Sequence, residues 1–256
     1  MTDAVVKEVM TFPVKGARGR RPDALIIDTA VGVQGDRRFA IKRRSDQPDV
    51  WAPKVHFRVC MNTPEMAAQT PEFRDGHEAS GSAAELDRRW LGKVAAALGE
   101  ADVAPLDTKG AYNLVDTNPH VYGPTVSFLN LASVRALETE TGWSIDPERF
   151  RMNVWYDDGQ PFSELAWADS FPGTRQIAVG TLRLRIQDAC ERCLAIEANP
   201  AIGRRDLRLL DALEAMLRNR GYTGSPHRGV FHVMGFLATP LGCDTITRGQ
   251  PIRPLD

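Results

Sequence analysis

Two closely spaced cysteines carry the most distinctive chemistry in this sequence. Cys190 and Cys193 form a C-x-x-C pair in the stretch DACERCLAIEANP, with Glu191 and Arg192 between them. A neighbouring guanidinium favours the thiolate, which is the form that attacks electrophiles and ligates metals. Arg192 therefore predicts a reactive or metal-binding thiol here, against the alternative that both cysteines are small buried packing residues.

The spacing of the pair leaves several chemistries open. A structural zinc site needs four ligands, and the remaining cysteines, Cys60 and Cys243, are isolated in the sequence. A thioredoxin-like redox pair normally begins a helix, whereas residues 194–200 are expected to form a short strand or turn. An iron–sulfur cluster requires more thiolates or histidines than this pattern provides. A metal held mainly by its own cofactor needs only one protein thiolate.

Short strands make up most of the elements that must position the pair. Strands are predicted over residues 5–12, 24–28, 39–42, 55–61, 149–156, 177–180 and 181–187, from β-branched and alternating runs between turn residues. In the last of these, Leu182, Leu184 and Ile186 alternate with polar residues. The cysteine pair is expected just after this strand. His232 is expected to be an ordinary half-buried histidine in a C-terminal strand.

Three helices are predicted from apolar spacing and from residues that begin or end helices. The first covers residues 82–98, with Ser82 and Glu85 as a capping box. The second covers residues 130–140 and ends at Gly142, and the third covers residues 206–220 and ends at Gly221. Residues 62–81, rich in proline and glycine, are expected to form a loop.

Composition narrows the classes of function. A chain of 256 residues with 43% hydrophobic and 25% charged residues can form one large domain or two modest ones. The net charge of −1 leaves no excess to drive binding to nucleic acid or to a membrane surface. The N-terminal residues contain no apolar run, so we expect no signal peptide or membrane span, a cytoplasmic location and reduced thiols.

Several stretches, taken in order, resemble the landmarks of a known family. They are Phe150–Val154 (FRMNV), Pro161–Trp167 (PFSELAW), the strand pair and Cys190–Cys193. This order is similar to that of the MOSC domain. Phe12–Gly16 (FPVKG) and Gly35–Phe39 (GDRRF) resemble two signatures of the β-barrel domain that precedes MOSC in the amidoxime-reducing branch.

The resemblance implies a strand-rich α+β fold. It places an N-terminal MOSC β-barrel-like domain over residues 1–110, with the helix at 82–98, and a MOSC β-barrel domain with a few flanking helices over residues 111–256. It also implies a molybdenum cofactor, a molybdopterin, between the two parts. Pyridoxal phosphate binding is associated with the wider superfamily only.

The resemblance also assigns residues. Cys193 matches the metal-ligating and catalytic cysteine, and Cys190 matches its non-ligating neighbour. Contacts to the cofactor are carried over onto Lys15, Arg37, Arg151, Asn153 and Arg192. Asn153 is expected to face the same side as Arg151, because residues two apart on one strand do so. Met152 departs from the family, which usually has proline there.

The implied function is reduction of a small N-oxygenated compound, such as a hydroxylamine, an amidoxime or an N-hydroxylated base. No acidic residue lies between Thr117 and Ser127, where the amidoxime reducers carry one, so His120 or Tyr122 is a candidate proton donor. Electrons are expected from a separate ferredoxin, flavin or cytochrome-type reductase. The alternatives are a sulfur carrier with a persulfide on Cys193 and a non-catalytic protein that binds or delivers the cofactor.

Overall fold

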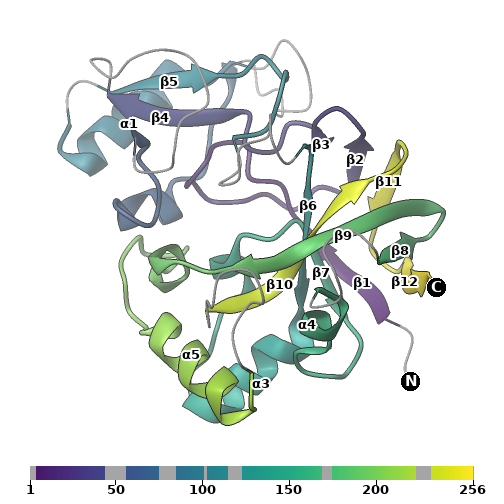
Figure 1. The fold of residues 1–256 in the computed structure, drawn as a ribbon. Helices are drawn as coiled ribbons and strands as arrows, with labels where there is room; N and C mark the ends of the chain where they lie inside the picture. Colours follow the sequence, from purple (N-terminus) through teal and green to yellow (C-terminus); the bar gives the residue numbers. More distant parts are fainter. Residues whose placement is uncertain are drawn as a thin grey trace.

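The computed structural model describes residues 4–43, 56–74, 85–100, 103–114, 123–168, 175–222 and 232–255. In these residues the strands form one closed barrel and two smaller sheets, and the helices pack around them (Figure 1). The strand-rich α+β fold predicted from the sequence is confirmed.

Seven strands close the barrel in the order β1-β12-β8-β9-β10-β6-β7. They are β1 (Ala4–Val9), β6 (Val126–Asn130), β7 (Val154–Asp157), β8 (Gln176–Val179), β9 (Leu182–Glu191), β10 (Val233–Pro240) and β12 (Pro251–Leu255). Neighbouring strands are antiparallel except β6 and β7, which are parallel. Because β1 pairs with both β7 and β12, the barrel closes only with a strand from the start of the chain.

The predicted alternation in β9 is confirmed. Leu182, Leu184 and Ile186 are buried, while Arg183 and Arg185 between them are exposed. Side chains two apart on a strand face one side, so the apolar set points into the barrel core. The strand continues further than predicted, because its pairing with β10 extends as far as Glu191.

Two smaller sheets come mainly from the first half of the chain. One has the order β11-β2-β3, formed by β11 (Asp244–Thr247), β2 (Ala24–Asp28) and β3 (Gly32–Val33), and the other pairs β4 (Phe39–Arg43) with β5 (Val103–Asp107). Figure 1 shows β4 and β5 beside α1, on the far side of the molecule from α3 and α5. The sheets cross the predicted domain boundary at residue 110, since β1 lies in the barrel and β2 pairs with β11.

The helices begin and end at residues with clear local causes. They are α1 (Arg88–Leu98), α3 (Leu131–Thr141), α4 (Ser163–Ala168) and α5 (Leu209–Asn219), with the 3-10 turns η2 (Pro64–Ala68), η4 (Pro147–Phe150) and η5 (Leu194–Glu197). Helix α3 ends at Gly142, as predicted, with this glycine in the left-handed conformation. Asn130, predicted as the first helical residue, is instead the N-cap, and its side chain accepts from the backbone of Ala132. None of the helices in the described ranges is long and apolar enough to cross a membrane.

Two predicted helix starts are wrong. Helix α1 begins at Arg88, because the carboxylate of Asp87 accepts from the first free backbone N–H groups. Ser82, the predicted start, lies outside the described residues. Helix α5 begins three residues later than predicted, at Leu209. The carboxylate of Asp206 is engaged elsewhere, in an ion pair of 2.7 Å with Arg149.

Two predicted strands are also wrong. Residues 56–61 form turns, because Asn62 accepts from the backbone of Val59 and donates to that of Phe57, which competes with a strand ladder. Residues 149–156 are divided between the end of η4, a left-handed residue at Arg151 and the start of β7. Asp146 caps η4 in front of a proline, a signal typical of a helical turn.

Candidate cofactor site

Arg37 and Arg151 meet at the centre of the candidate site. Both have a left-handed backbone, with φ of 46° and 55°. The Arg37 Nη2 donates to the Arg151 carbonyl oxygen at 2.7 Å, and the two guanidinium groups lie 5.2 and 4.5 Å from the centre of the Phe12 ring. Left-handed backbone is unfavourable for a residue with a side chain and occurs often at functional sites. The fold therefore brings together two of the predicted cofactor contacts.

The arginine pair carries positive charge that is partly shielded from solvent, since both residues are half-buried. Burial is the largest influence on the pKa of Arg151 and lowers it, and the charge of Arg37 lowers it further, while Cys60, Asp36 and Glu148 act in the opposite direction. The Arg151 Nη2 is buried and has no hydrogen-bond partner within the described part of the chain. A buried donor without a partner costs about 1–3 kcal/mol, which a bound anion would recover. The site thus fits an anionic group such as a phosphate.

Lys15 is linked to this pair through Leu114, whose backbone N–H donates to the Arg37 carbonyl oxygen. Its side chain is only 5% exposed, and Nζ donates to the Leu114 carbonyl oxygen at 2.7 Å. The following residue must be glycine, because Gly16 has a φ of +85° and a Cβ there would lie 2.6 Å from the Cα of Val59. The Cys60 thiol donates to the carbonyl oxygen of Gly16 at 2.7 Å. The loop that carries Lys15 is therefore fixed from both sides.

Arg192 ties the cysteine segment to the Arg151 segment. Its Nη2 donates to the Phe150 carbonyl oxygen at 2.5 Å, and its Nη1 lies 2.9 Å from the Cys190 Sγ and 3.4 Å from the Met152 Sδ. A planar guanidinium can serve several acceptors at once in a fixed geometry. Because Phe150 and Met152 flank Arg151, these contacts of Arg192 connect the Cys190–Cys193 segment, at the end of β9, to the Arg151 segment.

Cys193 lies just past the end of β9. It is half-buried, it precedes η5 as the N-cap residue, and its side chain makes no capping hydrogen bond. Leu194, the next residue, is 41% exposed. Within the described ranges no group of three or more His, Cys, Asp or Glu side chains could hold a metal ion. The assignment of Cys193 as ligand to a cofactor-held metal stays a prediction.

Asn153 does not share a strand with Arg151, so the predicted reason for grouping the two is wrong. The Asn153 side chain is 2% exposed. Its Oδ1 accepts from the Ser127 hydroxyl at 2.7 Å, and its Nδ2 donates to the Met10 carbonyl oxygen at 3.2 Å. The amide thus links the end of β1 to β6. Its contact with a cofactor stays a prediction.

The structure describes His232 but not the two candidate proton donors. His120 and Tyr122, the candidate proton donors, lie outside the described residues. His232 lies just before β10, and its Nε2 is 2.8 Å from the Glu214 carboxylate, with a third of its side chain exposed. This contact is that of an ordinary half-buried histidine, as predicted.

Sequence reasoning missed three residues of the site. Phe12 lies under both arginines, Asp36 forms an ion pair with Arg37, and the Met152 sulfur contacts Arg192. Phe12 and Asp36 belong to the two N-terminal signatures, and this membership could have marked them as candidate site residues. Met152, which stands in place of the family's proline, is 1% exposed and fixed by packing.

The fold and the site together define a barrel protein with a cysteine pair at the end of one strand and a half-buried arginine pair. The MOSC domain model matches residues 120–252, which is more than half of the chain. The chain belongs to the MOSC domain family, which is associated with the molybdenum cofactor. The amidoxime-reducing resemblance of the N-terminal signatures remains a prediction, because this match does not include them.

Curated relatives match over a limited region. The chain is similar to molybdenum cofactor sulfurase of Drosophila mojavensis, with 32% identity over 34% of this chain and 10% of the relative. It is also similar to the Drosophila ananassae protein of the same name, with 29% identity over 36% of this chain and 11% of the relative. The match thus spans about a tenth of the length of these relatives.

Solved structures show weaker likeness. The YuaD protein from Bacillus subtilis aligns over 99% of this chain and 96% of its own, with 11% identity and a TM-score of 0.43. YiiM from Geobacillus stearothermophilus aligns over 51% of this chain and 54% of its own, with 14% identity and a TM-score of 0.34. Scores this low carry no structural argument, and the family assignment rests on the sequence match.

Proposed function

We propose that this protein is a molybdenum-cofactor-dependent oxidoreductase that reduces N-oxygenated compounds. The observation that carries the proposal is the contact set of Arg192, which holds the Cys193 turn beside Arg151. This contact set would place a cysteine ligand close to an anion site, the combination that a metal with a phosphate-bearing pterin requires. When bound, the cofactor supplies the redox metal for removing oxygen from an N–O bond.

The chain's own residues would bind the cofactor, orient it and exclude solvent from it. Arg37 and Arg151 provide buried donors to the anionic part of the cofactor, and Cys193 provides a soft sulfur ligand. Phe12 blocks water from one face of the arginine pair and so strengthens its attraction for an anion. His120 is the proposed proton donor, and a ferredoxin, flavin or cytochrome-type reductase is the proposed source of electrons. The proposed location of the protein is the cytoplasm.

Cofactor content tests the proposal directly. The protein is produced in a host that makes the cofactor, and molybdenum and pterin are measured in wild type and in Cys193→Ala. We expect near-stoichiometric metal in wild type and its loss in the variant. Cys243→Ala is the matched control, because Cys243 is exposed and lies near Thr29, between β10 and β11. Wild-type protein without metal or pterin would exclude the reductase.

A second candidate is a sulfur carrier in which Cys193 holds a persulfide. Two observations favour it: the relatives are named molybdenum cofactor sulfurase, and the Arg192 guanidinium contacts a thiol in the same turn. A carrier would contain no molybdenum, yet would show cyanide-releasable sulfur that Cys193→Ala removes. A third candidate, a delivery protein, would contain pterin but would not turn over with any N-hydroxylated compound and electron donor.

A further inference from the structure

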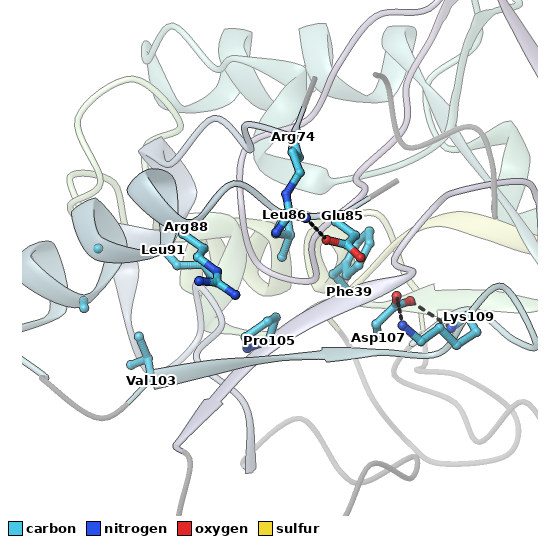
Figure 2. A pocket seen from close by; sticks show the side chains of 12 residues that line it. Phe39, Arg74, Glu85, Leu86, Arg88, Leu91, Val103, Pro105, Asp107 and Lys109 are labelled. Carbon is cyan, nitrogen blue, oxygen red and sulfur yellow. Dashed lines mark hydrogen bonds and ion pairs between the residues drawn. The ribbon is translucent and has the colours of Figure 1, made fainter. Parts of the chain in front are cut away.

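A groove lies between α1 and the β4–β5 sheet, and it includes none of the predicted site residues. Its volume is about 730 Å³, in the range of pockets that hold small organic ligands. The lining residues are Phe39, Arg74, Glu85, Leu86, Arg88, Leu91, Gly92, Ala95, Val103, Pro105, Asp107 and Lys109. Figure 2 shows ten of these residues labelled around the groove.

The groove combines an apolar floor with charged walls. Phe39, Leu86 and Val103 are buried beneath it, so they form a fixed surface of aromatic and aliphatic carbon. Such a surface suits the body of an aromatic or branched ligand rather than a strongly hydrated one. The polar side chains lie around this surface (Figure 2).

The charged side chains of the groove walls form two ion pairs, and one arginine has no ion-pair partner among the described residues. Arg74 pairs with Glu85 at 3.0 Å, and Lys109 pairs with Asp107 at 3.0 Å. Arg88, the first residue of α1, makes no ion pair or hydrogen bond from its side chain to any residue that the structure describes. Among the described residues, the groove therefore presents a guanidinium without a partner beside an apolar surface. Guanidinium groups bind carboxylates and related anions through paired hydrogen bonds.

Gly92 supplies an independent observation. It lies in the middle of α1, where glycine weakens a helix relative to alanine. A Cβ at this position would meet no atom within 4 Å, so no close packing requires glycine. Because Gly92 also lines the groove, the absent side chain has one structural consequence: it leaves the groove open beside Leu91.

We propose that this groove binds a small organic anion with an aromatic or branched apolar body. The body lies on Phe39 and its neighbours, and the anionic group pairs with Arg88. The proposal does not depend on the molybdenum cofactor, since the groove and the Cys193 turn share no residue. It assigns a second ligand site to the chain.

Fluorescence titration with anilinonaphthalene sulfonate, an aromatic anion, tests the proposal on the full-length protein. We expect saturable binding at one site in wild type. The variant Arg88→Glu should weaken binding by about tenfold, the effect of losing one charge-assisted pair. The matched control is Arg89→Glu, which changes the neighbouring exposed residue outside the groove by the same charge. Neutral phenylnaphthylamine should bind more weakly than the sulfonate and respond equally little to both variants.

A steric variant completes the test. Gly92→Trp should abolish binding while the thermal unfolding midpoint stays close to that of wild type, because the added side chain enters open space. Absence of saturable binding in wild type would overturn the proposal, as would equal weakening by Arg88→Glu and Arg89→Glu. If Gly92→Trp fails to fold, the pair of charge variants still decides the outcome.

Discussion

The Arg37 guanidinium donates a hydrogen bond of 2.7 Å to the carbonyl oxygen of Arg151, across 114 positions in the sequence. Both residues have left-handed backbone, and both stack against Phe12. Two strained turns from separate parts of the chain therefore support each other. A site held in this way is rigid before any ligand binds, which reduces the entropy that binding must offset.

The strain at Arg151 can be measured by comparing two variants. Arg151→Gly and Arg151→Ala both remove the guanidinium, but only glycine adopts a φ of 55° without steric cost. We expect the glycine variant to have the higher free energy of unfolding, by about 1 kcal/mol. Urea denaturation measures this difference. Equal stability of the two variants would show that the backbone at this position is not strained.

Arg192 should contribute to stability through its several contacts. Lysine keeps the charge of Arg192 but cannot reach Phe150 and Cys190 together, so Arg192→Lys should lower the free energy of unfolding by about 2 kcal/mol. The control is Arg185→Lys on β9, where the side chain is exposed and a change within about 0.5 kcal/mol is expected. Similar losses in both variants would contradict the role given to Arg192.

Glu164 should make stability depend on pH. Burial raises its pKa from 4.5 to about 7, against hydrogen bonds from Ser133 and Asn130 that favour the charged form, and the charge of Asp158 raises it further. The folded protein then binds this proton more tightly than the unfolded chain does. The contribution of Glu164 to stability is therefore full below pH 4.5 and falls by about 3 kcal/mol as the pH rises to about 7.

The variant Glu164→Gln cannot titrate and should remove this part of the pH dependence. Urea denaturation at several pH values between 4.5 and 8 measures it, with the slope of wild type as the reference. We expect a smaller decline in stability for the variant over the same range. An unchanged slope would mean that Glu164 keeps an ordinary pKa in the folded protein.

Gly235 should be intolerant of any side chain. Its φ is +78°, and a Cβ there would lie 2.2 Å from the Phe128 carbonyl oxygen on the neighbouring strand β6. Gly235→Ala should cost about 3 kcal/mol or more, because neither backbone can move without opening the barrel. Gly242→Ala is the matched control, since its Cβ would meet nothing within 4 Å. Thermal unfolding of the two variants provides the comparison.

Local patterns predicted well wherever nearby residues decide the structure. The stop at Gly142 defines the end of α3, and the alternation from Leu182 to Ile186 defines the core face of β9. Prediction failed in part at residues 149–156, where a single strand was expected but η4 includes residues 149 and 150 and β7 begins only at Val154. A short-range turn signal there outweighed strand propensity.

The sequence by itself determined the chemistry available to this protein: a cysteine pair next to an arginine, two basic signatures near the start of the chain, and the order of landmarks that belongs to the MOSC family. Only the tertiary structure decided that Arg37 contacts Arg151, that Arg192 joins the Cys190 turn to Phe150, and that β1 closes the barrel. The physical reason is that such contacts join segments far apart in the chain. Their geometry depends on strand register and on barrel closure, which local propensities do not encode.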